Sequence, residues 1–192
     1  MQSWGLNAAG QIGDGTTTER HTPVLVGGLV GVVAISAGYQ HSLALLTDGS
    51  LRAWGNNANG QLGDGTTTQR LTPVQVVGLA NVRSIACGDT HSLGILGTGT
   101  VRAWGANSQG QLGDGTTTSS ATPVQVSGLA AVKFATAGAA HSMTLLSDGT
   151  ARSFGNNAYG QLGDGSTITR LTPIPVSFSN SLSATMLLLL SE

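Results

Sequence analysis

The chain has 192 residues and a formal net charge of −1, and only 9% of its residues are charged. It has no cluster of lysine and arginine that could follow a phosphate backbone, which disfavours a nucleic-acid partner. A single cysteine, Cys87, excludes an intrachain disulfide framework, and the longest apolar run, residues 186–190, is too short to span a membrane.

One pattern recurs in four copies at a spacing of 50 residues, without insertion or deletion. In the second copy, residues 53–73, it reads A-W-G-N-N-A-N-G-Q-L-G-D-G-T-T-T-Q-R-L-T-P, and the other copies begin at residues 3, 103 and 153. Glycines occupy fixed positions in the pattern, so they mark turns rather than disorder. A fixed period of this length is typical of a repeat architecture, which we expect to govern the whole chain.

Taken in order, the chain predicts one incomplete unit, three complete units and a degenerate end. Residues 1–28 contain only the third and fourth strands of a unit. In the first complete unit, short apolar runs predict strands at residues 32–37, 41–47, 51–54 and 74–76, with a tight turn at Asp48-Gly49. The complete units are residues 29–78, 79–128 and 129–178, and residues 179–192 keep one apolar strand at 184–190.

The predicted central strands are apolar at consecutive positions, which indicates that both faces of each sheet are buried against neighbouring sheets. Four strands in a unit of about 40–50 residues are typical of a β-propeller blade. Pro73 is expected to open the fourth strand, and because proline cannot donate to a ladder, that strand should be the edge of the sheet. We therefore predict an all-β fold, a β-propeller of four-stranded antiparallel blades.

The repeated residues W-G-x-N-x-x-G-Q-L-G-D-G, T-P-x-x-V, A-G-x-x-H-S-L-A-L and D-G-x-x-x-x-W-G resemble the regulator-of-chromosome-condensation repeat, over residues 1–178. The sequence is similar in type to bacterial members of this family. The resemblance implies a seven-bladed propeller. Functions in this family differ. The founding member is a chromatin-bound nucleotide-exchange factor for a small GTPase, and relatives include plant ultraviolet sensors and a secreted bacterial inhibitor of β-lactamases. The resemblance implies a rigid ring whose loops bind other proteins.

The number of blades sets this chain apart from that family. Three complete units and two leading strands amount to about four blade equivalents, so we expect a partial ring or a fragment of a seven-bladed propeller. A unit that completes itself by association is the alternative. An open arc leaves apolar blade faces and strand edges exposed, which predicts self-association through these edges.

Histidine recurs once in each complete unit, as His41, His91 and His141. An acid–base or metal role is conceivable, but a residue that every unit repeats more simply serves the fold, and we interpret it as a turn residue bonding a neighbouring carbonyl. Every candidate Ser-His-Asp set is repeated in the same way, whereas a catalytic site requires asymmetry. We therefore expect no enzyme activity, no cofactor and no metal.

The motif L-G-D-G supplies one carboxylate in each copy, whereas a calcium loop supplies several within about a dozen residues. Asp64 is therefore predicted to bond the local backbone in an Asx-turn, with Gly63 and Gly65 at positive φ. A large aromatic residue recurs on the third strand and is predicted to be a buried anchor between blades. These residues are Trp4, Trp54, Trp104 and Phe154.

The copies differ from one another at three sets of positions, all on predicted loops, where binding residues concentrate. Tyrosine and arginine in these sets are of the types that form interface hot spots. Neutral drift at solvated loop tips is the alternative interpretation. The candidate partner-binding residues are Tyr39, Gln40, Asp89, Thr90, Arg20, Arg70 and Tyr159.

These observations predict a non-enzymatic scaffold that presents propeller loops to a protein partner. An architectural surface or adhesin-like spacer is the alternative, and guanine-nucleotide exchange on a small GTPase has only the family resemblance in its favour. The low charge, the single lysine at position 133 and the threonine-rich loops favour an extracellular or cell-surface protein of bacterial type, with the cytoplasm as the alternative.

Overall fold

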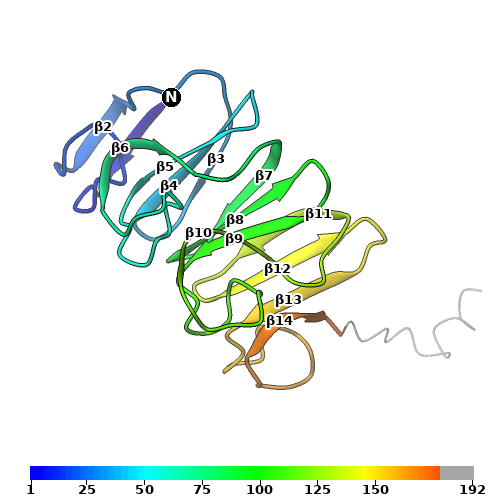
Figure 1. Ribbon diagram of the computed structural model, residues 1–192. Helices are drawn as coiled ribbons and strands as arrows, with labels where there is room; N and C mark the ends of the chain where they lie inside the picture. Colours follow the sequence, from blue (N-terminus) through cyan, green and yellow to red (C-terminus); the bar gives the residue numbers. More distant parts are fainter. Residues whose placement is uncertain (178–192) are drawn as a thin grey trace, which may run out of the picture.

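The computed structural model describes residues 1–177, and every regular element in them is a β-strand (Figure 1). The degenerate strand predicted within residues 179–192 lies outside this range. No helix in the described part of the chain is long and apolar enough to cross a membrane.

The strands form one two-stranded and three four-stranded antiparallel sheets. The first sheet contains β1 (Gln2–Gly5) and β2 (Arg20–Leu25). The second contains β3 (Val32–Ala37), β4 (His41–Leu46), β5 (Leu51–Gly55) and β6 (Arg70–Gln75). The third contains β7 (Val82–Cys87), β8 (His91–Leu96), β9 (Val101–Gly105) and β10 (Ser120–Gln125). The fourth contains β11 (Val132–Ala137), β12 (His141–Leu146), β13 (Ala151–Gly155) and β14 (Arg170–Pro175).

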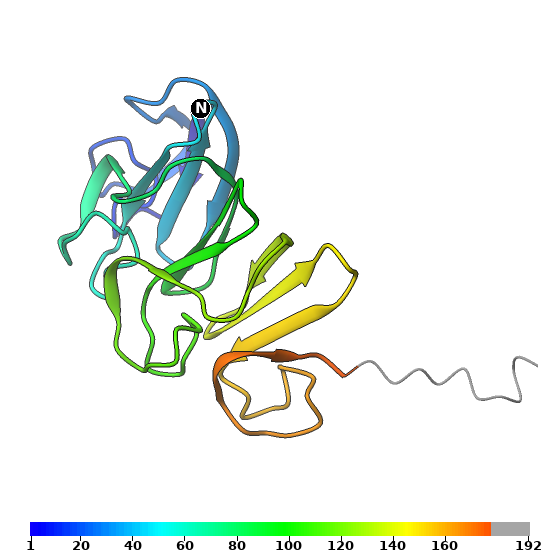
Figure 2. The ribbon, with the colours of Figure 1, turned by 45° about the vertical axis from the view of Figure 1, so that its right-hand side comes forward.

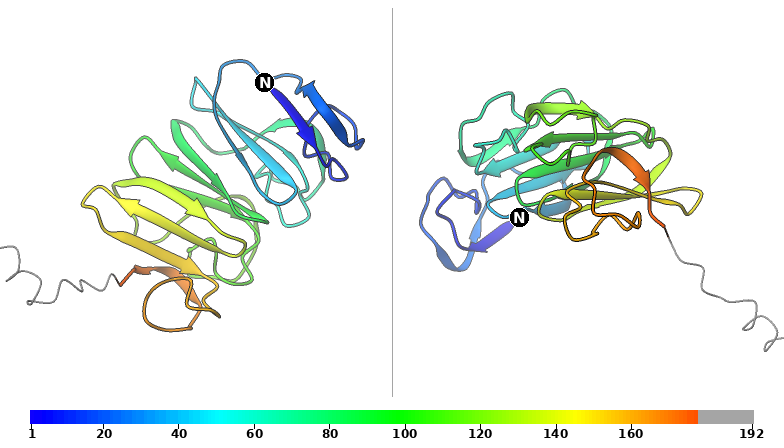
Figure 3. Two further views of the ribbon diagram at one scale, coloured as in Figure 1. Left: turned by 180° about the vertical axis from the view of Figure 1, so that it is seen from behind. Right: turned by 90° about the horizontal axis from the view of Figure 1, so that it is seen from below.

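Strands within each four-stranded sheet pair in chain order, and the sheets follow one another as a fan (Figures 1 and 2). The first strand of the third sheet, β7, contacts the first strands of both neighbours, β3 and β11. The first and the fourth sheet lie at opposite ends of this fan (Figure 3). The predicted all-β fold of four-stranded propeller blades is therefore confirmed, in the form of an open arc.

The hairpin between the second and third strands of a blade forms at the predicted dipeptide. The Leu46 N–H donates to the Ser50 carbonyl at 3.0 Å, and Gly49 has a φ of 77°. Glycine reaches such a φ without steric cost. The Asp48 carboxylate accepts from the Ser50 N–H at 2.9 Å, which adds a second local bond to the turn.

The core lies between the sheets, where the aromatic residue on the third strand of one sheet enters the face of the preceding sheet. Trp104 of β9 is fully buried against Leu43, Leu45 and Leu51 of the second sheet. Phe154 of β13 is buried in the same way against the third sheet. The predicted anchors are confirmed at three of the four positions, namely Trp54, Trp104 and Phe154.

Trp4 is the exception, and the prediction that it is a buried anchor is wrong. It is 63% exposed, whereas Trp54 and Trp104 are 0% exposed. Trp4 lies on β1 of the first sheet, and within the described residues no sheet precedes that one. Within the same residues, the first sheet also lacks the counterpart of the strand that pairs with Trp54 and Trp104, so burial of the aromatic residue depends on the surrounding strands and sheets and not on the strand that carries it.

The fourth strand of a blade begins earlier than predicted. β6 begins at Arg70 rather than at residue 74, so Pro73 lies inside the strand and not at its start. The register between β5 and β6 shifts between Ala53 and Gly55, and such an irregular ladder tolerates a residue without an N–H. The strand does lie at the edge of its sheet, as Pro73 predicted.

The buried and exposed tryptophans provide a matched test of the inter-blade anchor. Trp54→Ala should lower the free energy of unfolding by about 3–5 kcal/mol, because it removes a fully buried aromatic ring. Trp4→Ala should lower it by less than about 1 kcal/mol, because most of that side chain is already exposed. Guanidinium unfolding of both variants measures the difference. Equal losses would contradict the role of the preceding sheet.

A second test concerns Ala131, which has a φ of 52° in the connection between two sheets. The left-handed conformation costs a residue with a Cβ about 1–2 kcal/mol, and Gly31 occupies the corresponding place with a φ of 68°. Ala131→Gly should therefore raise the free energy of unfolding by about 1 kcal/mol. The neighbour Ala130 lies outside the left-handed region, so Ala130→Gly should lower it instead. If both variants shifted the guanidinium midpoint in the same direction, Ala131 would not be strained by its positive φ.

Candidate functional site

The long loop between β5 and β6 is organised around a buried asparagine. Asn57 is 0% exposed, and its amide nitrogen donates to the backbone carbonyls of Thr66 and Thr68, each at 3.0 Å. Its Oδ1 accepts from the Leu62 N–H at 3.0 Å. Sequence reasoning assigned this residue no role, although its recurrence in every copy was the available signal. The equivalents are Asn7, Asn107 and Asn157.

The motif L-G-D-G forms the turn that its sequence predicts. The Thr66 N–H donates to Asp64 Oδ1 at 2.9 Å, which confirms the Asx-turn. Gly63 and Gly65 have φ values of 68° and 82°, a backbone conformation that only glycine adopts without strain. Asn57 also donates to the Asp64 carboxylate at 3.1 Å, so the turn is bonded to the centre of the loop.

Arg20 and Arg70 are not at loop tips, and that part of the prediction is wrong. They lie on β2 and β6, where their Nη2 atoms are 2.6 and 2.8 Å from the carboxylates of Asp14 and Asp64. Burial would raise the pKa of Asp14, but hydrogen bonds from Thr16 and Arg20 outweigh it and lower that pKa to about 2. Both guanidinium groups are therefore engaged within their own repeat. A partner-binding role for them stays a prediction.

The repeated histidine joins one sheet to the next. His41 Nε2 is 2.9 Å from Ser92 Oγ, and that hydroxyl donates to the Gln61 carbonyl at 2.9 Å. The expected partner, a neighbouring carbonyl, is thus replaced by a hydroxyl on the following sheet. The indole N–H of Trp104 donates to the same Gln61 carbonyl at 2.9 Å. A Cβ on Gly38 would collide with the imidazole, which explains the glycine of A-G-x-x-H.

The loops after the first strands of successive sheets lie directly beside one another. The Tyr39 N–H of one loop donates to the Asp89 carbonyl of the next at 3.3 Å. The Gln40 carbonyl accepts from the Asn56 N–H at 2.8 Å, which ties the same loop to the long loop of its own blade. Four of the candidate residues, Tyr39, Gln40, Asp89 and Thr90, are therefore neighbours on one rim of the arc.

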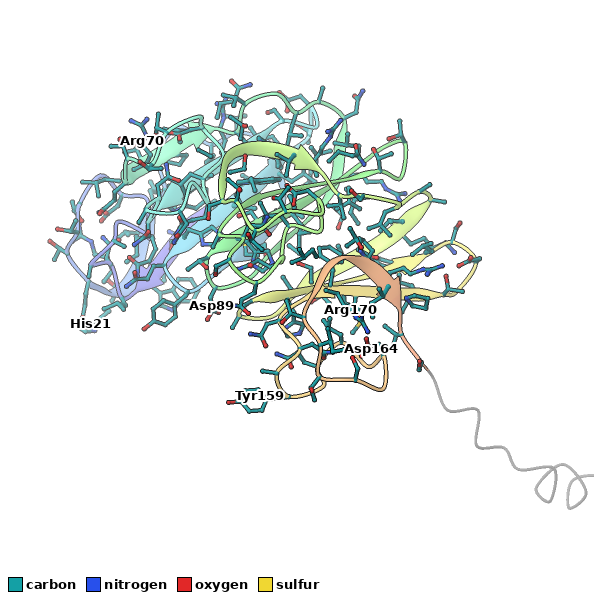
Figure 4. The ribbon with its side chains drawn as sticks, turned by 60° about the horizontal axis from the view of Figure 1, so that its bottom comes forward. His21, Arg70, Asp89, Tyr159, Asp164 and Arg170 are labelled. Carbon is teal, nitrogen blue, oxygen red and sulfur yellow. The ribbon has the colours of Figure 1, made fainter. Side chains whose placement is uncertain are left out.

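The remaining aromatic candidate is separate from this group. Tyr159 is 94% exposed and projects outward from the loop between β13 and β14, while Arg70 lies on the far side of the molecule (Figure 4). The Tyr159 N–H donates to the Gln161 side chain at 2.9 Å, so the backbone beneath the exposed ring is held in place. The seven candidate residues thus do not form a single surface cluster.

Metal-binding and thiol chemistry find little support in this arrangement. Residues 1–177 contain no group of three or more histidine, cysteine, aspartate or glutamate side chains placed to hold a metal ion. Burial raises the pKa of the Cys87 thiol to about 12, so the thiol stays protonated and weakly nucleophilic at neutral pH.

The repeat is matched by a known family model. The Regulator of chromosome condensation (RCC1) repeat matches residues 3–45, 48–95, 98–145 and 148–186, which is most of the chain. This chain belongs to the RCC1 repeat family. A second RCC1 repeat model matches residues 32–61, 82–111 and 132–161. A search of curated protein sequences finds no match.

Solved RCC1 propellers share this fold. Human WBSCR16 is 25% identical with a TM-score of 0.77, and the match covers 89% of this chain and 46% of that one. Yeast RCC1 (Prp20), solved with Kap60 bound, is 24% identical with a TM-score of 0.79, covering 94% and 45%. Prp20p from Saccharomyces cerevisiae, described with its binding to Gsp1p and histones, is 24% identical with a TM-score of 0.81, covering 94% and 47%. The chain therefore spans about half the length of these structures.

The geometry divides the residues of this RCC1 repeat into two groups. The repeated asparagine and aspartate bond inside a long loop, and His41, His91, Trp54 and Trp104 bond between adjacent sheets. The positions that differ between copies include the exposed side chains at Tyr39, Asp89 and Tyr159. The side chains of the second group are therefore the ones that the fold leaves exposed and that differ from one blade to the next.

The buried histidines make stability depend on pH. Histidine ordinarily has a pKa of 6.5, and burial lowers the pKa of His41 to about 4 and that of His91 to about 3. Below pH 6.5 the unfolded chain binds protons that the folded chain does not, so stability is complete above pH 6.5 and is lost as the pH falls toward 4. Each of the two histidines should contribute a loss of about 1.4 kcal/mol per pH unit.

Guanidinium unfolding at pH 7, 6 and 5 measures this slope. His91→Gln should reduce the slope, because it removes one of the three histidines, His41, His91 and His141, whose pKa burial lowers. His21→Gln is the matched control, since the His21 side chain is 85% exposed and its replacement removes no buried imidazole. A free energy of unfolding that is constant from pH 7 to pH 5 would show that the buried histidines are not kept neutral by the fold.

Proposed function

We propose that this chain is a non-enzymatic interaction scaffold, in which RCC1 blades hold variable loops on one rim for recognition of a protein partner. The observation that carries the proposal is the contact between the loops of Tyr39 and Asp89, which belong to successive blades. Sequence differences between the copies thereby become differences along one continuous rim. A rigid array with variable exposed loops suits binding, because little conformational entropy is lost on association.

The exposed side chains on these loops are of types that recognise proteins. Tyr39 is 73% exposed and offers an aromatic ring with a hydroxyl, and Asp89 beside it offers a carboxylate. Tyrosine contributes large contact area at low entropic cost and is enriched at interface hot spots. The binding of Kap60, Gsp1p and histones is stated for yeast Prp20, and it supports recognition of proteins by related propellers.

Guanine-nucleotide exchange on a small GTPase is a second candidate, favoured by membership of the RCC1 repeat family. A stimulated nucleotide-release assay with the isolated chain tests it. We further propose an extracellular or surface location, which the low charge and the single lysine support. Fractionation of the producing cells with an antibody to the chain tests the location, and protein found only in the cytosol would contradict it.

Loop substitutions test the interaction proposal. With a captured protein partner, Tyr39→Ala should weaken the Kd by about tenfold or more, because a central aromatic contact is worth about 1.4 kcal/mol or more. Val30→Ala is the matched control, since Val30 is 85% exposed on the connection between the first and second sheets, beyond β2. Equilibrium titration by calorimetry gives both constants.

The outcomes separate the candidate functions. Binding that withstands substitution of Tyr39, Gln40, Asp89 and Tyr159 together would contradict the rim proposal and favour an architectural spacer. Nucleotide release that the same substitutions abolish would identify a GTPase as the partner. Equal effects of Tyr39→Ala and Val30→Ala would show a general loss of structure, which thermal unfolding of the two variants detects.

A further inference from the structure

The same two sets of groups, called here the donor half and the acceptor half, form the contact between adjacent sheets each time it occurs. The following sheet supplies the aromatic ring, and the preceding sheet supplies a backbone carbonyl and a glycine beneath the ring. Trp54 donates to the Gln11 carbonyl at 2.8 Å, and Trp104 donates to the Gln61 carbonyl at 2.9 Å. A Cβ added at Gly63 would lie 2.8 Å from the Trp104 ring nitrogen, so the glycine is needed for this close approach.

The fourth sheet carries the acceptor half of this contact without an aromatic ring against it in the described residues. Next to Gly163, the nearest atom to an added Cβ is a Val176 methyl at 3.0 Å, and no ring is within reach. Leu145 is 38% exposed, whereas its counterparts Leu45 and Ile95 are 4% and 0% exposed. This face is hollowed, and Phe134, Met143 and Ala151 also line the hollow.

The first sheet carries the donor half. Trp4 has the same place on its strand as Trp54 and Trp104, but it is 63% exposed while they are fully buried. The equivalent indole N–H groups of Trp54 and Trp104 each bond a carbonyl of the preceding sheet, whereas the described residues offer Trp4 no preceding sheet, and its exposed ring lines a hollow together with Met1, Ile35 and Trp54. The first and fourth sheets lie at opposite ends of the molecule, so the two halves cannot meet within one arc (Figure 3).

We propose that a second copy of this chain joins these halves, with Trp4 of one molecule packing over Gly163 of the next and donating to its Gln161 carbonyl. The occupant follows from the chain itself, because every group at this contact has an equivalent that already forms it between adjacent sheets. The arrangement is head to tail, so each molecule uses one end as donor and the other as acceptor. Such a heterologous contact extends to further copies or closes into a ring.

The test uses the complete chain and two variants at opposite ends. Sedimentation velocity over a dilution series should show the wild-type chain passing from one copy to two or more as concentration rises. Trp4→Ala and Leu145→Glu should each weaken association at least tenfold, because each removes one half of the contact. Tyr39→Ala is the control and should associate like the wild type, since that exposed ring lies on a loop of the second sheet and is not part of either half.

Mixing the two variants gives the sharper result. Trp4→Ala keeps an intact acceptor face and Leu145→Glu keeps an intact donor, so an equimolar mixture should form a complex of two chains although neither variant associates alone. Trp4→Phe should weaken association less than Trp4→Ala, because Phe154 already fills the same place without an N–H. Tryptophan emission should shift to the blue on association, and that shift reports Trp4, since Trp54 and Trp104 are buried throughout.

Three results would overturn the proposal. The first is a wild-type chain that stays a single copy at the highest soluble concentration. The second is undiminished association of Trp4→Ala, which would place the contact elsewhere. The third is a mixture of variants that does not form the complex, which would indicate a two-fold contact between identical surfaces. Thermal unfolding of each variant confirms that it is folded before these results are compared.

Discussion

The structure depends on one backbone carbonyl in each repeat. The carbonyl of Gln61 accepts from the Ser92 hydroxyl and from the Trp104 indole, both at 2.9 Å, and both donors belong to the following sheet. His41, from the same blade as Gln61, completes the set by bonding the same Ser92 hydroxyl. Since all of these groups are buried, each is costly to leave unpaired, and the sheets are held in one fixed relation. The arc and the placement of its rim loops follow from this relation.

The polar side chains that recur in each blade, although of types found in catalytic and metal sites, form hydrogen bonds that hold the fold together. Asn57 closes the long loop, Asp64 closes its turn, and His41 bonds the next sheet, so none of them is available to a ligand. The ion pair of Arg70 with Asp64 is not needed by every blade, because Ser120 stands in that place in the third copy. What remains for recognition is the exposed set at which the copies differ, together with the unmatched ends of the arc.

Several local features were predictable because they depend on a few consecutive residues. The hairpin at Asp48-Gly49 and the Asx-turn at Asp64 need only a glycine and a short polar side chain, and both form where the sequence placed them. The role of Asn57 was not predicted, because its partners lie five to eleven residues away and only the folded loop brings them together. Arg70 was misplaced for a related reason, since the strand that carries it extends through Pro73 across an irregular ladder.

The sequence by itself determined the repeat, the four-stranded blade and the edge position of the fourth strand, because periodicity, turn residues and proline act locally. Only the tertiary structure decided which copies of the repeated aromatic residue are buried between sheets. Trp4 and Trp54 occupy the same position in the same motif, yet one is exposed and the other is buried. The difference lies in the neighbouring sheet, which a residue needs for burial and which its own strand cannot supply. The motif alone therefore does not show which of its copies lies at an end of the arc, where the aromatic residue is left exposed.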